Sequence, residues 1–281
     1  VITGSNGLPH AGNIPGARSG GECVVDNSDN VWLYGGEGFD ATASTSTTGL
    51  DHLWLYDAAL GQWAFKAGHS DCRTDQSDCY PITDGFKRTS EDYLQPGARS
   101  NFSLAIDSAN RIWLYGGRGF RATGPLYNVT FNDVDTLSDL WVFTNDMWNP
   151  VSGNSSITML PTYGNQGVFD SANAPGGRNS ASLIASHDGA GLFLFGGNGF
   201  GSHPSNTGRL SDLWYYEISS GDWMHKSGTK DIESTGVYGT KGIASNSNFP
   251  GGRENASIWE SNDGQIILFG KNIPPFIFAF Q

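Results

Sequence analysis

The chain has 281 residues, with 39 glycines, 12% aromatic residues and 16% charged residues, and this composition favours short strands joined by tight turns. The net charge of -12 has the wrong sign for a surface that binds nucleic acid through its phosphates, so no nucleic-acid partner is expected. No run of 18 or more apolar residues occurs, so we expect no membrane insertion within this segment.

Two elements recur along the chain. A Pro-Gly-Ala/Gly-Arg element occurs four times, and its arginines, Arg18, Arg99, Arg178 and Arg253, are spaced 81, 79 and 75 residues apart. An apolar stretch follows each arginine, and the first three stretches close on a glycine pair: Gly35 and Gly36, Gly116 and Gly117, and Gly196 and Gly197. Because these stretches are apolar at every position rather than at alternate ones, we expect strands that are covered on both faces.

Two aromatic elements complete each repeat. The third element carries Trp54, Trp141 or Trp214, and the fourth carries Trp63, Trp148 or Trp223 just after a turn rich in Gly, Asp or Asn. With one further strand after each arginine, the pattern predicts four strands per repeat in chain order, hence an antiparallel meander. Radial repetition of such sheets makes a propeller.

These ordered elements resemble the Kelch repeat family. The resemblance covers nearly the whole chain and implies an all-β fold, a Kelch-type β-propeller made of four-stranded antiparallel blades. The repeat of roughly 78 residues exceeds the ~50 usual for Kelch, so each blade carries long insertions. We expect a single partial propeller with linkers at 1–14, 67–95, 151–174 and 227–249, blades at 15–66, 96–150, 175–226 and 250–270, and a divergent tail at 271–281.

The ends suggest an incomplete propeller of about three and a half blades. Residues 4–18 match residues 239–253 at a constant offset of 235, and the fourth repeat shows no third or fourth strand. The apolar tail Phe276–Phe280 is either unrelated coding sequence or an edge-covering segment. We expect the terminal blades to expose apolar faces bearing Trp32, Tyr34, Ile267 and Phe269, which would make the isolated chain marginally stable and prone to association.

The long connections define a candidate binding face. Those between second and third strands (37–49, 118–136 and 198–209) and those between blades emerge at the same end, whereas the opposite turns (27–30, 58–62 and 219–222) are short. A Gly-Phe pair places Phe39, Phe120 and Phe200 at the loop roots, either as binding residues or as plugs against the blade. Arg121, Tyr127 and His203 have no counterparts in the other repeats and are further candidates.

The repeated arginines are expected to brace neighbouring strands, with Asp139 and Asp212 as partners. His52 stands where the other repeats have Asp, so the pairing of Arg18 should differ. Cys23 aligns with Leu104, Leu183 and Ile258, which predicts a buried core residue.

No catalytic residue, metal or cofactor is predicted. The six histidines show no metal-ligand spacing, and the acidic groups of the loops lack the calcium-loop pattern. Galactose oxidase also has a Kelch propeller, but its copper site, with tyrosine and histidine ligands and a cysteine cross-linked to tyrosine, has no match here.

The sequence is compatible with two cellular locations. Cys72 and Cys79 share one polar loop and form either a local disulfide, which favours an oxidising compartment, or two free thiols. Asn128 and Asn154 are the glycosylation candidates. We expect an extracellular or cell-surface protein, with the cytoplasm as the alternative.

Three functions compete. The first is a non-catalytic Kelch-repeat binding module for a protein or carbohydrate ligand, which binds through the face with the long loops. The second is a fragment of a galactose-oxidase-like secreted oxidoreductase. The third is an intracellular Kelch substrate adaptor, although no BTB segment is present.

Overall fold

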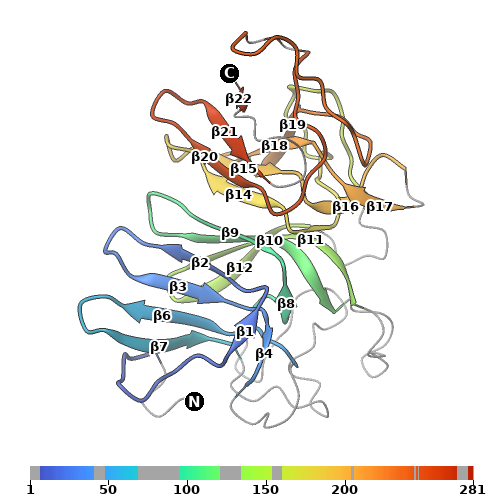
Figure 1. The fold of residues 1–281 in the computed structure, drawn as a ribbon. Coiled ribbons are helices and arrows are strands. Elements are labelled where there is room, and N and C mark those ends of the chain that lie inside the picture. Colours follow the sequence, from blue (N-terminus) through green and yellow to red (C-terminus); the bar gives the residue numbers. More distant parts are fainter. Residues whose placement is uncertain are drawn as a thin grey trace. The chain divides into compact units, whose positions relative to one another are not determined.

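The computed structural model describes residues 7–40, 48–68, 95–120, 134–153, 160–203, 206–243, 245, 247–270 and 278–280. All regular structure in these ranges is β-strand, as the composition predicted (Figure 1). No helix in the described part of the chain is long and apolar enough to cross a membrane. The chain divides into two compact units, Val1–Ile157 and Thr158–Gln281.

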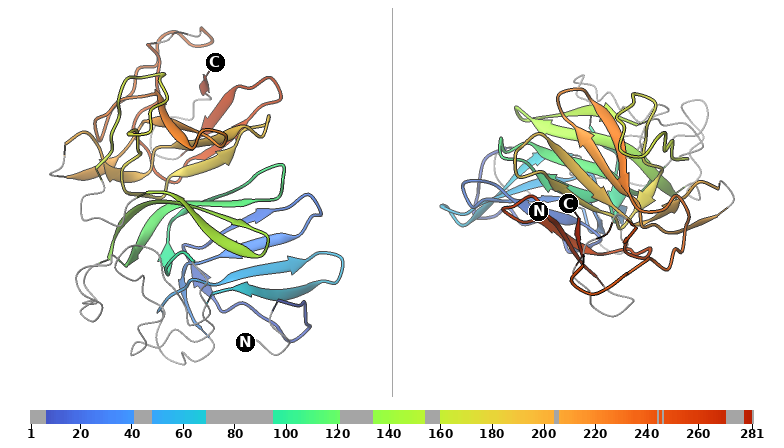
Figure 2. Two further views of the ribbon diagram at one scale, coloured as in Figure 1. Left: turned by 180° about the vertical axis from the view of Figure 1, so that it is seen from behind. Right: turned by 90° about the horizontal axis from the view of Figure 1, so that it is seen from above.

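The first unit holds two antiparallel meanders. Sheet I contains β2 (Glu22–Val25), β3 (Val31–Tyr34), β6 (Leu53–Asp57) and β7 (Gln62–Ala67) in that order. Sheet II contains β9 (Ser103–Ile106), β10 (Ile112–Phe120), β11 (Val134–Thr144) and β12 (Met147–Ser152). The four strands of sheet I lie side by side in chain order, coloured blue to cyan in both Figure 1 and the left view of Figure 2. The predicted four-stranded pattern is therefore present in these two repeats.

The second unit repeats the pattern. Sheet III contains β14 (Ser182–Ala185), β15 (Gly191–Phe195), β18 (Leu213–Glu217) and β19 (Asp222–Ser227). Sheet IV contains β20 (Ser257–Glu260), β21 (Ile266–Phe269) and β22 (Phe278–Phe280). The expectation that the fourth repeat lacks a third strand is thus wrong, because the tail pairs with β21 as an edge-covering strand. The tail shares no repeat signature, so only its apolar, aromatic composition hinted at a strand.

Two arginine elements form separate small sheets at the start of the long connections, and a third joins sheet II. β1 (Arg18–Ser19) pairs with β4 (Glu37–Gly38), which pairs with β5 (Thr48–Gly49). β13 (Arg178–Asn179), β16 (Asn198–Phe200) and β17 (Thr207–Arg209) repeat this arrangement, and β8 (Arg99–Ser100) pairs with the extended end of β10. Each arginine therefore lies at the root of a connection between the second and third strands of a sheet.

The glycine pairs let the chain pass from a main sheet to its small sheet. Gly35 and Gly36 have φ values of 61° and 98°, and the pairs in the next two repeats match them closely. A Cβ on Gly36 would lie 2.7 Å from the carbonyl oxygen of Ser19. Only glycine combines this left-handed backbone with so close an approach.

Sheets I and II pack face to face. Tyr34 is fully buried, its ring lies 5.3 Å from both Phe102 and Trp148, and its hydroxyl donates to the Pro96 carbonyl at 3.1 Å. Trp32 packs against the same core. The expectation that Tyr34 lies on an exposed face is therefore wrong, because this face of sheet I turns toward sheet II.

Cys23 is exposed and free, which contradicts the prediction that it is buried. Neighbouring side chains on β2 point to opposite faces. Val24 packs into the core shared with sheet II, so Cys23 and Val25 face away from it. The alignment with buried leucines ignored that this face of sheet I has no second sheet against it within its unit.

Sheets III and IV are joined by the same bonds as sheets I and II. The amide of Gly197 donates to Arg253 O and that of Asn255 to Ser180 O, both at 2.9 Å, as Gly36 and Asn101 donate across the first pair. One face of sheet IV, with Ile258, Ile266 and Leu268, packs into the core with sheet III. The other face carries Phe269, which is 50% exposed, as expected from the sequence.

Candidate functional site

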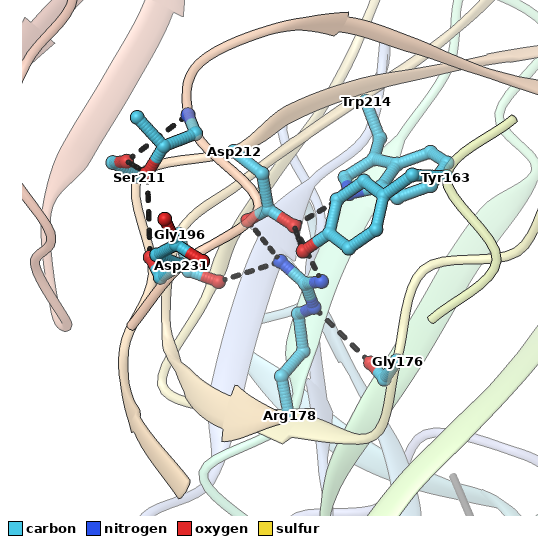
Figure 3. A network of polar contacts seen from close by, with 9 residues as sticks. Tyr163, Gly176, Arg178, Gly196, Ser211, Asp212, Trp214 and Asp231 are labelled. Atoms are coloured by element: carbon cyan, nitrogen blue, oxygen red, sulfur yellow. Dashed lines mark hydrogen bonds and ion pairs between the residues drawn. The ribbon is translucent and has the colours of Figure 1, made fainter. Parts of the chain in front are cut away.

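A buried ion pair lies at the root of the 198–209 connection. Arg178 donates from Nη1 to Asp212 Oδ1 at 2.7 Å and from Nη2 to Oδ2 at 2.9 Å, and both side chains are fully buried. The same guanidinium donates to the carbonyls of Gly176 and Gly196 (Figure 3). Arg178 thus ties its own strand, the glycine pair and the start of β18 together.

Aromatic side chains complete this cluster. Trp214 Nε1 and the Tyr163 hydroxyl both donate to Asp212 Oδ2, at 2.7 and 3.0 Å (Figure 3). Burial would raise the pKa of Asp212, but the charge and hydrogen bonds of Arg178 outweigh burial and hold this pKa below its usual value. Burial, followed by the charge of Asp212, raises the pKa of Tyr163. The carboxylate accepts four hydrogen bonds, so the cluster anchors the connection as a fixed, fully bonded unit.

The second repeat has the same arginine, aspartate and tryptophan contacts. Arg99 donates to both oxygens of Asp139 at 2.7 and 2.8 Å and to the Gly116 carbonyl, and Trp141 donates to Asp139 at 2.7 Å. Burial lowers the pKa of Arg99, but the charge of Asp139 more than compensates and the net direction is upward. The two ion pairs predicted from the sequence are therefore present.

The first repeat departs from this pattern, as expected from His52. Arg18 keeps its bonds to the carbonyls of Gly16 and Gly35, at 3.2 and 3.0 Å. Within the described residues, Arg18 Nη2 and Trp54 Nε1 are buried without a hydrogen-bond partner. Burial lowers the pKa of Arg18 to about 10.

A polar surface covers the outer side of the third connection. Ser202 N donates to Lys230 O at 2.7 Å, so the 198–209 connection lies against the following linker. Arg209 Nη2 lies 2.6 Å from Glu233 Oε2, and both side chains are partly exposed. We call the residues 198–203, 206–209 and 230–233 the loop-linker surface. This surface joins the two classes of long connection that the sequence placed at one end.

The predicted binding residues fall in different environments. His203 lies on the loop-linker surface, 83% exposed, with its Nδ1 3.9 Å from Asp231 Oδ1. Phe39 is exposed at its loop root, while Phe200 is half-buried and pairs with Thr207. Phe120 ends β10, and its side chain lies outside the described part. Of the candidates whose side chains are described, Phe200 and His203 lie in one surface and Phe39 lies elsewhere.

Comparisons with family models and with curated proteins give no match. No family model matches the chain, and no curated protein matches it.

The other predicted binding, disulfide and glycosylation residues lie outside the described part of the chain. Arg121, Tyr127, Cys72, Cys79, Asn128 and Asn154 all lie outside the described residues. Within the described residues, no group of three or more His, Cys, Asp or Glu side chains is arranged to hold a metal ion.

The short turns at the opposite end are held by their own side chains. Asp26 accepts hydrogen bonds from the amides of Ser28 and Asn30 and from Trp32 Nε1 at 3.0 Å. Asp107 does the same in sheet II, where it also pairs with Arg111 at 2.6 Å. These aspartates stabilise compact turns.

Sequence reasoning missed a set of asparagines that hold the linkers. Asn13 donates from Nδ2 to Leu8 O at 3.4 Å and to Trp63 O at 3.0 Å. Asn173 bonds in the same way to Val168 and Trp223. The signal was available, since Asn13, Asn173 and Asn248 each stand two residues before the proline of a Pro-Gly-x-Arg element.

Proposed function

We propose that this chain is part of a Kelch-type β-propeller and acts as a non-catalytic binding module for a protein or carbohydrate ligand. Three features support a propeller: the four-stranded meanders, the sheet-on-sheet packing within each unit, and the identical bonds that join sheets I to II and III to IV. The extracellular or cell-surface location stays a proposal, as does the Kelch assignment.

The observation that carries the binding role is the contrast between the two ends of the sheets. At one end, the second-to-third connections of sheets I and III are each rooted in a small extra sheet beside an arginine, which is partly buried in sheet I and fully buried in sheet III. At the other end the chain makes tight turns that bond to themselves. Rigidly anchored long loops on a repeating scaffold are where binding proteins place their recognition residues.

The loop-linker surface favours polar ligands. It presents an imidazole, a guanidinium and carboxylates within one small area, from His203, Arg209, Asp231 and Glu233. Such a mixture can donate to and accept from sugar hydroxyls or peptide groups. The half-buried Phe200 at its root adds apolar area.

Loop exchange tests the proposal. Replacing 198–209 with a short Gly/Ser turn should abolish binding to hits selected from a glycan array and a displayed peptide library. Replacing 219–222, the short turn of the same sheet, should leave binding unchanged. Thermal melts identify variants that fail to fold. Binding that survives the first exchange but is lost in the second would show that the ligand uses the opposite end.

A further inference from the structure

In sheet I, the backbone contacts of Arg18 match those of Arg178 in sheet III. Arg178 donates from Nε to one carbonyl at 3.2 Å and from Nη1 to another at 3.0 Å. Arg18 makes the same two bonds at the same distances, to Gly16 O and Gly35 O. Because the guanidinium is planar, equal bonds from the same two nitrogens indicate the same orientation in both sheets.

The indole of Trp54 also keeps the position of its counterpart. Its ring centroid lies 6.5 Å from that of Trp63, with 89° between the ring planes. Trp214 and Trp223 show the same two values. Both donors of the sheet III cluster are therefore present in sheet I with matching geometry.

The difference between the two sheets is the acceptor. In sheet III, Asp212 Oδ2 accepts from Arg178 Nη2 at 2.9 Å and from Trp214 Nε1 at 2.7 Å. In sheet I, Arg18 Nη2 and Trp54 Nε1 are both buried and, within the described residues, have no hydrogen-bond partner. Trp54 is only 2% exposed, so bulk solvent does not reach its N–H group.

Two neighbouring side chains could replace the aspartate, but neither accepts from these donors. The backbone of His52 lies where that of Asp212 lies, since both carbonyls accept at 3.1 Å from the first glycine of the pair. The His52 ring, however, packs edge-on against Phe65 of β7, with 5.5 Å between the ring centroids. Asp51 accepts from Gln95 Nε2 at 3.3 Å.

The guanidinium of Arg18 consequently has no counter-charge in contact with it among the described residues. Burial lowers the pKa of both Arg18 and Arg99, but only for Arg99 does a carboxylate, that of Asp139, reverse the net direction. A buried charge without its partner is unfavourable, so an anion at this position would be stabilised.

We propose that Arg18 and Trp54 form a binding site for one small carboxylate anion. One oxygen would accept from Arg18 Nη2 and Trp54 Nε1, and the other from Arg18 Nη1, as the two oxygens of Asp212 do in sheet III. Because both unpaired donor atoms are buried, the site takes an anion of the size of formate or acetate, not the acidic side chain of a larger partner.

The site lies at the root of the connection between β3 and β6, and it is separate from the loop-linker surface. The bound anion would join Arg18 to the start of β6, as Asp212 joins Arg178 to the start of β18. It would therefore stabilise the root of this connection. The inference does not depend on the proposed binding function.

The indole N–H signals of the full chain, labelled with nitrogen-15, test the proposal. Sodium formate replaces sodium chloride at constant ionic strength. We expect a saturable downfield shift of the Trp54 signal, because a charge-assisted hydrogen bond deshields the indole proton. Trp54→Phe identifies this signal by its loss. The signals of Trp141 and Trp214 should not move, since these indoles already donate to aspartates.

Two variants separate the geometry of the site from its charge. Arg18→Lys keeps the charge but loses the two parallel donors, and it should weaken formate binding about tenfold. His52→Asp supplies a carboxylate from the chain itself, so its Trp54 signal should lie downfield before formate is added and should not respond to formate. Thermal melts show that each variant is folded at the temperature of the titration.

Three results would overturn the proposal. The first is a Trp54 signal that does not move when formate replaces chloride. The second is an equal shift of the Trp54, Trp141 and Trp214 signals, which would indicate a general effect of the salt. The third is a response to formate in His52→Asp that equals the response of the parent chain, which would place the bound formate elsewhere.

Discussion

In sheet I, His52 occupies the position at which sheets II and III have an aspartate that accepts two hydrogen bonds from buried donors. In sheets II and III, an aspartate at this position accepts from both the arginine and the tryptophan of the cluster. In sheet I, Arg18 Nη2 and Trp54 Nε1 have no such acceptor among the described residues. A buried donor without a partner lowers stability by about 1–3 kcal/mol.

We therefore predict that His52→Asp stabilises the chain. The new carboxylate should accept from both donors and raise the free energy of unfolding by about 1–3 kcal/mol in urea titrations at pH 7. Its pKa should fall beside Arg18, so the gain should be present at neutral pH and shrink as pH falls through that lowered value. His52→Asn supplies an acceptor without charge and should gain less. Equal stability of both variants would argue against an ion pair.

Glu22 gives sheet I a pH-dependent contact with sheet II. Its Oε2 accepts from Leu104 N at 2.7 Å, and burial raises its pKa to about 7, although this hydrogen bond partly opposes the shift. A carboxyl with a raised folded pKa favours the folded state when protonated. Its contribution is complete below the unfolded value near 4.5 and is lost as pH rises through about 7.

Glu22→Gln should remove this dependence. The amide oxygen can still accept from Leu104 N, but the side chain no longer ionises. Between pH 5 and pH 8, we expect the parent chain to lose up to about 3 kcal/mol more unfolding free energy than the variant. Chemical denaturation of both proteins across this range measures the difference. Parallel pH profiles would show that Glu22 keeps an ordinary pKa.

At the scale of the elements, the linker asparagines act as clamps on the outer strands. Asn173→Ala removes two bonds from a buried side chain, to the carbonyls of Val168 and Trp223, so it should lower the unfolding free energy by about 1–2 kcal/mol. Asn248→Ala removes one described bond from a partly buried side chain and should lower it by less than about 1 kcal/mol. Thermal melts of both variants and of the parent chain measure these losses of stability. Equal losses would mean that the turn alone, without the strand contact, determines stability.

The sequence predicted the elements that repeat and failed where an element has no counterpart. Asp139 and Asp212 could be paired with Arg99 and Arg178 because both residues recur at matching places in the repeat pattern, although 40 residues separate one pair and 34 the other. β22 carries no repeat signature, so its pairing with β21 depended on structure.

Exposure was predicted less well than pairing. Alignment treats every repeat as if it had neighbours on both faces, and Cys23 was placed in a core for that reason. Tyr34 was misplaced because a sequence does not say which face of a strand meets the next sheet. The candidate site was predicted only as a class of loops, since contacts such as Arg209 with Glu233 join segments that share no repeat position.

At the scale of the whole molecule, sheet IV presents an apolar face. Ser257 lies opposite Phe269 and Trp259 lies opposite Ile267, so these four residues share one face. Trp259 and Phe269 are 45% and 50% exposed, whereas Tyr34, Tyr115 and Phe195, the counterparts of Phe269, are buried. Adjacent exposed aromatic groups favour association, whereas isolated exposed apolar residues do not.

We therefore expect the chain to associate at micromolar concentration through this face. Phe269→Asp should raise the dissociation constant about tenfold, because it replaces half-exposed apolar area with a charge that must be desolvated in the complex. Leu60→Asp is the control, since Leu60 is exposed on an isolated turn, and this variant should associate like the parent. Light scattering over a concentration series measures the association of the parent chain and of both variants. A parent chain that stays monodisperse and monomeric, with a cooperative melt, would show that this face needs no cover.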